Sequence, residues 1–219
     1  MQLEIILAVV AVVGTIAGIA WWFSPDQRAK RAMKSVARTT IKDAPDGEKV
    51  RVTGRVECDA PLYAPLSGRA CAAWRVIVRE KRGKHTYTLV DDSEVTAFRL
   101  VDGDDRAHVD ESYVKVVLDE DASGSTGLFG EPPPELVDFL ADRGHSTQGF
   151  FLSKTLWYRE GVAEIDETVA VMGLARWEAD PEKRAQAAGY RTVSQPERLV
   201  LCAPDDGPLL MSDHHDVVR

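Results

Sequence analysis

Cysteine is scarce in this 219-residue sequence, which contains only Cys58, Cys71 and Cys202. The three are an odd number, are widely spaced and form no C-x-x-C pair, so they indicate neither a disulfide framework nor a zinc ribbon. Ser67 stands outside any G-x-S-x-G nucleophile elbow. Two acidic segments, Asp91-Asp92 and Asp102-Gly103-Asp104-Asp105, lack the D-x-D-x-D-G…E spacing of a calcium loop. We therefore predict reduced thiols, no catalytic residue, no metal and no cofactor.

One short segment, Asp213-His214-His215-Asp216, does offer four potential metal ligands in a row. Adjacent side chains of an extended chain point in opposite directions, and the end of a chain is usually loose. A metal site needs several donors that converge on one point. The sequence therefore favours a loose tail here over a metal site.

Positive charge is also scarce outside the N-terminal part of the chain. Residues 43–219 contain 21 Lys and Arg against 33 Asp and Glu, a formal charge of −12, whereas residues 1–42 contain 6 basic and 2 acidic residues. Phosphate backbones repel an acidic body. We predict that residues 43–219 do not bind nucleic acid.

A long apolar run is present from Leu3 to Phe23, with Glu4 as its only charge. It forms about 30 Å of helix, which matches the hydrocarbon core of a bilayer. A cleaved signal peptide would have a basic start and a shorter apolar stretch. Trp21 and Trp22 suit the headgroup region. We predict a transmembrane anchor over 1–23.

The charges that flank this anchor predict its orientation. Basic residues follow the run and none precedes it, so the N-terminus lies outside and the body in the cytoplasm. Gly14 and Gly18 form a G-x-x-x-G face that allows two such helices to approach closely. Homodimer formation through this face is a hypothesis.

Residues 24–42 are predicted to form a basic juxtamembrane helix. Ser24 suits the cap, Pro25 suits the first helical position, and apolar residues including Met33 and Ile41 follow at helical spacing. Two interpretations remain open for this helix. It is either a solvated continuation of the membrane helix or a helix that lies on the lipid surface.

Residues 43–219 are predicted to form one mainly β domain, a small antiparallel barrel or sandwich with short helices. Its most mobile part is expected between Asp119 and Pro134. Helices are expected over Glu135–Asp142, ending at Gly144, and over Pro181–Gly189. Alternating apolar residues predict strands over Lys49–Val56, Cys71–Arg79, Thr86–Val90, Thr96–Val101, Tyr113–Leu118, Leu156–Gly161, Thr168–Ala175, Arg191–Ser194, Arg198–Leu201 and Leu209–Ser212.

The most specific local motif is Pro61-Leu62-Tyr63-Ala64-Pro65-Leu66-Ser67-Gly68-Arg69-Ala70-Cys71. Its prolines restrict φ and Ser67-Gly68 supplies a turn, which predicts a rigid connection between two strands. Exposed aromatic and arginine side chains are enriched in protein interfaces. The predicted contact surface consists of Tyr63, Pro65, Leu66, Ser67, Gly68 and Arg69. The alternative is that Tyr63 and Leu66 pack onto the domain.

This motif, together with Gly54, Tyr158–Gly161 and Val169–Gly173, resembles the GIDE domain, also called the beside-a-membrane (BAM) domain. The domain occurs in mitochondrial outer-membrane ubiquitin ligases and in prokaryotic membrane proteins. The resemblance covers nearly all of residues 43–219. It implies a membrane-tethered β-rich module that binds partners and has no established catalysis of its own.

In the mitochondrial ligases a second membrane span and a zinc-binding RING follow the domain, and the RING carries ubiquitin transfer. This sequence has neither a second apolar run nor the Cys and His pairs of a RING. We therefore expect a relative of the prokaryotic single-span proteins, tethered to the bilayer and binding an unidentified protein partner. The alternative is a ligase-related or hydrolytic membrane enzyme.

Overall fold

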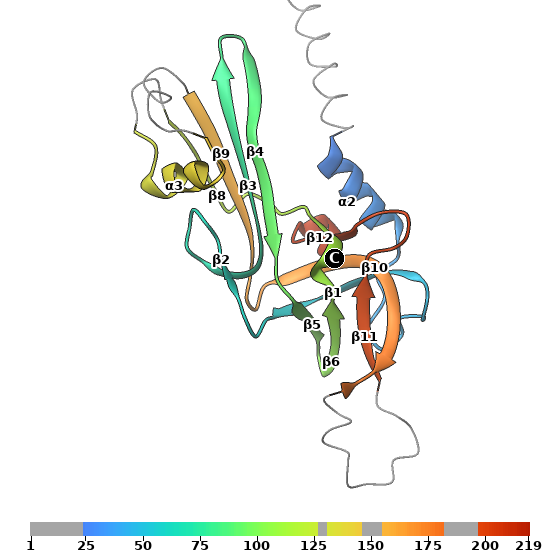
Figure 1. Ribbon diagram of the computed structural model, residues 1–219. Coiled ribbons are helices and arrows are strands. Elements are labelled where there is room, and N and C mark those ends of the chain that lie inside the picture. Colours follow the sequence, from blue (N-terminus) through green and yellow to red (C-terminus); the bar gives the residue numbers. More distant parts are fainter. Residues whose placement is uncertain (1–23, 127–130, 146–154, 182–196) are drawn as a thin grey trace, which may run out of the picture.

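The structure is a computed structural model that describes residues 24–126, 131–145, 155–181 and 197–219 (Figure 1). The described residues are mainly β, as predicted, and form two sheets with a few short helices. The predicted anchor with Gly14 and Gly18, the helix predicted after Pro181 and the strand Arg191–Ser194 lie outside these residues. Among the described residues, no helix is both long enough and apolar enough to cross a membrane.

The first sheet closes into a five-stranded barrel, because β1 pairs with both β5 and β10. Its core is apolar and includes Val52, Leu100, Val171 and Leu201, all completely buried. Strands β12 and β7 continue this sheet beyond β10. The sheet consists of β1 (Lys49–Glu57), β5 (Phe98–Asp102), β6 (Asp105–Val109), β11 (Glu197–Cys202), β10 (Thr168–Ala179), β12 (Leu209–Ser212) and β7 (Val114–Val116), the last preceded by the 3-10 turn η1 (Glu111–Tyr113).

Two strand pairs of this sheet depart from the predicted antiparallel arrangement. Strand β11 runs parallel to β6, and β12 runs parallel to β7. A parallel pair needs a long connection between its strands. Val109 and Leu201, which pair in this way, are separated along the chain by strands that include part of the second sheet. A hairpin pattern read along the chain does not reveal such a pairing.

The second sheet is built on the long strand β3 (Ala70–Arg82), which pairs with β4 (His85–Val95) on one edge and β9 (Thr155–Glu164) on the other. Strand β8 (Ala122–Ser125) pairs with β9, and the short β2 (Leu62–Tyr63) pairs with the start of β3. Part of the predicted loop from Asp119 to Pro134 is thus an ordered strand. Helix α3 (Pro134–Asp142), which agrees with the predicted helix, packs Phe139 edge-on against Trp74 at 6.1 Å.

Helix α2 (Pro25–Ser35) packs on the barrel beside α5 (His215–Val218). Ala29 and Met33 are buried among Val117, Ala170 and Met172. Neither of the two interpretations of this helix therefore describes its inner face, which contacts the rest of the protein.

The predicted helix over 24–42 is too long, since α2 ends at Ser35 and Val36 is extended. After the helix the chain joins the barrel, where Thr39 donates its backbone N–H to the carbonyl of Arg51 at 2.9 Å. Ile41 is buried in the barrel core. The β-branched run Thr39-Thr40-Ile41 favours this extended path over a helix.

Candidate functional site

The predicted contact surface consists of the end of β2 and the turn that joins β2 to β3, and we call residues 61–69 the Pro61–Arg69 loop. The turn is closed by a hydrogen bond from the N–H of Ala64 to the carbonyl of Arg69, at 2.9 Å. The N–H of Gly68 donates back to the carbonyl of Ala64 at 2.8 Å, and Gly68 has a φ of 69°. Glycine adopts this left-handed conformation without strain. The turn predicted at Ser67-Gly68, which connects two strands, is thus present.

Glu160 of β9 holds this loop from below. Its side chain is completely buried, and its two carboxylate oxygens accept the N–H groups of Leu66 at 2.8 Å and Ser67 at 3.0 Å. Charge-assisted hydrogen bonds of this kind are roughly twice as strong as neutral ones. The backbone of the loop is therefore fixed by a side chain that lies 94 positions beyond Leu66 in the sequence.

The guanidinium of Arg69 is engaged within the protein. It donates to Glu164, lies 3.8 Å from a carboxylate oxygen of Asp121, and donates through Nε to the hydroxyl of Ser67 at 3.2 Å. The role predicted for Arg69, a polar anchor for a partner, therefore competes with these contacts. In this structure Arg69 braces the base of the loop.

Tyr63 is the exposed aromatic residue of the loop, with 70% of its surface accessible to solvent. Leu66, in contrast, is half-buried and packs against the core of the second sheet. The alternative prediction, that both side chains pack onto the domain, is therefore correct for Leu66 and wrong for Tyr63. Beside Leu66 lies a pocket of about 200 Å³, whose wall also includes Ser123, Leu136 and Tyr158.

Cys71, at the end of the motif, has the properties of a packed thiol. It is completely buried, and burial together with the nearby Glu160 raises its pKa to about 11. The thiolate is the nucleophilic form of cysteine. A neutral, enclosed thiol is therefore a poor nucleophile, and the residue serves packing between β2 and β3.

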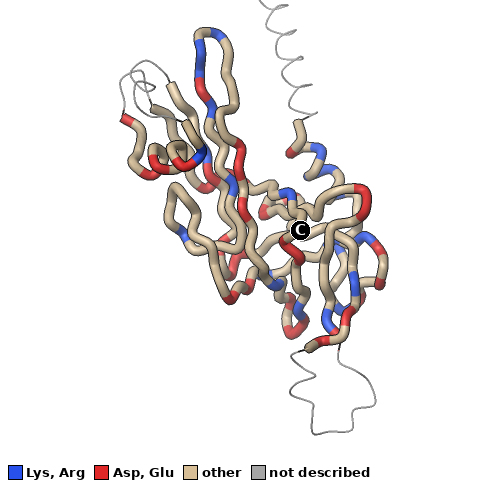
Figure 2. Tube along the Cα trace, viewed as in Figure 1, with Lys and Arg blue, Asp and Glu red and all other residues tan. Residues whose placement is uncertain are grey.

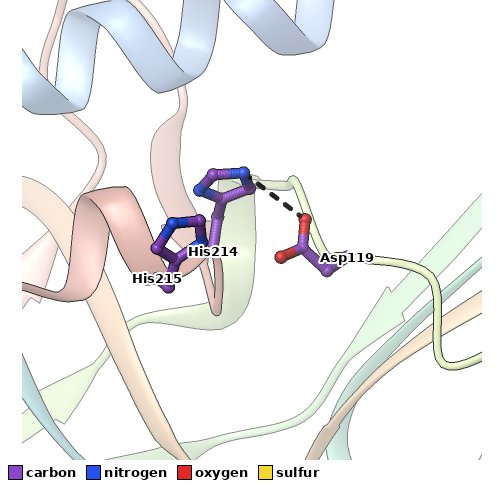
Figure 3. Close-up of side chains that lie close together, drawn as sticks. All are labelled: Asp119, His214 and His215. Carbon is purple, nitrogen blue, oxygen red and sulfur yellow. Dashed lines mark ion pairs between the residues drawn. The ribbon is translucent and has the colours of Figure 1, made fainter.

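Figure 3 shows a second cluster, in which Asp119, His214 and His215 each offer one ligand atom and these atoms lie within 4.8 Å of one another. Nε2 of His214 is 3.9 Å from the carboxylate of Asp119, and the two imidazole rings stack at 4.8 Å. Burial and the ammonium of Lys30 lower the pKa of His214. A neutral imidazole suits both metal binding and packing.

The charges around this cluster favour a structural role over a metal site. Lys30 of α2 places its ammonium 3.2 Å from the carboxylate of Asp119 and so neutralises the group that a metal would need. Nε2 of His215 lies 2.8 Å from Asp216, which itself pairs with Lys34 at 2.9 Å. The cluster joins α2, the segment after β7 and the C-terminal helix.

This ordered C-terminus differs from the expected loose tail. His214 caps α5 by accepting the N–H of Asp216 at 3.2 Å, and Val217 is completely buried beside Met33. Asp213 accepts the N–H of Asp119 at 2.8 Å, and burial raises the pKa of its carboxyl to about 7. No local pattern in the sequence signals these contacts, because their partners lie far away along the chain.

A cleft of about 710 Å³ lies between α2, β3 and β9. Its wall carries charges of both signs, and Arg75 is part of it. The guanidinium of Arg75 donates to Asp26 of α2 and to Asp91 of β4, at 2.9 Å and 2.8 Å. These contacts tie the start of α2 to the second sheet. The charged residues of the cleft therefore include ion pairs that hold the elements of the fold together.

Comparisons of this chain with known protein families, with characterised proteins and with solved structures find no match.

Proposed function

We propose that this protein is a membrane-tethered, non-catalytic interaction module. In this proposal residues 1–23 form the transmembrane anchor, the described residues lie at the cytoplasmic face of the bilayer, and the Pro61–Arg69 loop binds a protein partner. A resemblance to the GIDE or BAM domain in the same residues suggests the same class. The G-x-x-x-G face of Gly14 and Gly18 offers a route to a homodimer within the membrane.

The observation that carries the proposal is the exposure of Tyr63 on a loop whose backbone is held by hydrogen bonds to a buried side chain. The buried carboxylate of Glu160 fixes the loop backbone, and Arg69 braces its base, yet Tyr63 itself is 70% exposed. A preorganised loop loses little conformational freedom on binding. Tyrosine is also among the residues that contribute most to interfaces.

A photoreactive amino acid at position 63 tests this surface in native membranes. Tyr113 provides the matched control, because it is 60% exposed but lies in η1, away from the loop. We expect a specific cross-linked protein from position 63 and none from position 113. The purified partner should then bind the Tyr63→Ala variant at least roughly tenfold more weakly than the wild type.

Two results would contradict the proposal at different points. Equal or absent cross-linking from both positions would remove the loop as the contact surface. Extraction of the full chain from membranes by alkaline carbonate would overturn the anchor, because a transmembrane helix resists such a wash.

A further inference from the structure

The turn between β3 and β4 is strongly basic, although the body as a whole is acidic. Lys81, Arg82 and Lys84 are all exposed there. Between Arg79 and Val90 the only acidic residue is Glu80, which is completely buried and pairs with Arg82 at 2.7 Å. We call residues 81–87 the basic hairpin tip. A cluster of this sign on a body of charge −12 indicates a partner that is negatively charged.

Two exposed aromatic side chains accompany these cations. Tyr87 is 48% exposed and Trp157, on the neighbouring strand β9, is 41% exposed. The guanidinium of Arg82 lies 5.5 Å from the ring of Tyr87, and the ammonium of Lys81 lies 5.9 Å from the ring of Trp157. Tryptophan and tyrosine beside basic residues are the combination that favours a membrane–water interface.

The hairpin places this tip at the same end of the molecule as the start of α2. In Figure 1 the β3–β4 turn is at the top of the view, and the Pro25 end of α2 points the same way, while the barrel lies below both. Figure 2 shows the blue Lys and Arg positions at the turn. The ion pair between Arg75 and Asp26, at 2.9 Å, fixes α2 to the middle of β3. Strand β3 then runs about 23 Å further to Arg82.

We propose that the basic hairpin tip binds the headgroups of anionic lipids in the membrane to which the protein is tethered. This inference rests on the proposed anchor, since that anchor would leave the described chain at Ser24, next to the start of α2. Lysine and arginine side chains bind lipid phosphates, and Tyr87 and Trp157 enter the headgroup layer. The protein thus has a second, reversible contact with the bilayer.

The charge distribution favours a lipid surface over nucleic acid as the partner. A nucleic acid is an extended polyanion and would meet the acidic body as well as the tip. A membrane surface touches only the end of the hairpin, and the anchor keeps it close, so a few cations suffice. Each cation near an anionic leaflet favours the contact about fivefold.

The test uses the full chain in phosphatidylcholine vesicles with and without phosphatidylglycerol. A fluorophore attached through Thr86→Cys reports the approach of a quencher carried on lipid headgroups. Cys58→Ser and Cys202→Ala remove the two half-buried native thiols. The matched control carries the label through Asp104→Cys, an exposed site in the β5–β6 turn at the barrel end.

We expect strong quenching at position 86 only with phosphatidylglycerol, and weak quenching at position 104 in both vesicles. Lys81→Gln with Lys84→Gln should lower the contact equilibrium roughly 25-fold, because two cations are lost. Raising the salt from about 0.1 M to about 1 M should weaken it as well. Arg82 is left in place because it neutralises the buried Glu80.

The two proposals fail in different ways in this experiment. If the chain stays with the vesicles after a carbonate wash but the label at position 86 is insensitive to phosphatidylglycerol or to the double substitution, the lipid contact is overturned and the anchor stands. If the chain washes off, the anchor is overturned and the inference falls with it. A response of the label to a soluble polyanion, without one to phosphatidylglycerol, would overturn the lipid assignment in favour of that other partner.

Discussion

Replacement of Asp213 by asparagine should stabilise the folded protein at neutral pH. Asp213 accepts the backbone N–H of Asp119 at 2.8 Å, and an asparagine oxygen can accept the same bond. The aspartate, however, is destabilised by partial burial and by the nearby charges of Asp119, Glu167 and Asp121, which together raise its pKa from 3.8 to about 7. The Asp213→Asn variant would keep the hydrogen bond without the charge.

The direction of the pH dependence follows from that raised pKa. Between about pH 4 and pH 7 the folded state keeps a proton on Asp213 that the unfolded state releases, so the free energy of unfolding falls as the pH rises. Each pH unit in this window lowers the free energy of unfolding by at most about 1.4 kcal/mol. Over the whole window, the loss of stability due to Asp213 is therefore at most about 4 kcal/mol. Because the carboxyl keeps some contact with water, we expect roughly 1–2 kcal/mol.

The assay is urea unfolding of the full chain in mild detergent, followed by tryptophan fluorescence from about pH 4 to pH 8. The Asp213→Asn variant should match the wild type at the acidic end and exceed it by the amount above near pH 8. Asp104→Asn, at an exposed turn, is the control and should change little at any pH. A constant difference between Asp213→Asn and the wild type across the pH range would refute the argument.

Three further substitutions test how the sheets and α2 are held. Glu160→Ala leaves two loop N–H groups without their acceptor and should lower the free energy of unfolding by roughly 2–4 kcal/mol, with a smaller loss for Glu160→Gln, measured in urea. Gly173→Ala would place a methyl group 2.6 Å from the carbonyl of Cys202 and should cost roughly 1–3 kcal/mol, whereas Gly207→Ala, which meets nothing within 4 Å, should change the melting temperature little. Arg75→Gln removes the ion pair to α2 and should speed amide exchange in α2 roughly tenfold, because the free energy of local opening falls by about 1–2 kcal/mol. Unchanged exchange would show that the ion pair does not hold the helix.

Strands that were predicted correctly from the sequence include several that are rich in apolar residues. Strands β1, β3 and β10 are buried along most of their length, so apolar residues recur through each of them and mark it in the sequence. Strand β8 escaped prediction because its sequence, Ala-Ser-Gly-Ser, carries no large apolar side chain. Glycine is needed at position 124 of that strand because an added methyl group would lie 2.3 Å from the hydroxyl of Tyr158.

The candidate site could be located from the sequence, but its internal contacts could not. Prolines and Gly68 mark the Pro61–Arg69 loop locally, so its turn was predictable. Its buried support, Glu160, was visible only as part of the family resemblance, because no local rule says which distant strand lies beneath a loop. The C-terminal helix was missed for a related reason, since Lys34 lies 182 positions before its partner Asp216.

Helix α2 determines what the tether can do for the proposed function. Met33 is buried against Ala170 and Met172 of β10. Lys30, Lys34 and Asp26 form ion pairs with three separate segments. Helix α2 is therefore part of the body and not a flexible linker. Ser24, with an extended backbone, caps this helix. If the proposed anchor ends at this point, it would hold the body close to the bilayer without by itself setting the tilt of the body. A contact of the basic hairpin tip with lipid would fix that tilt, and with it the direction in which Tyr63 faces a partner.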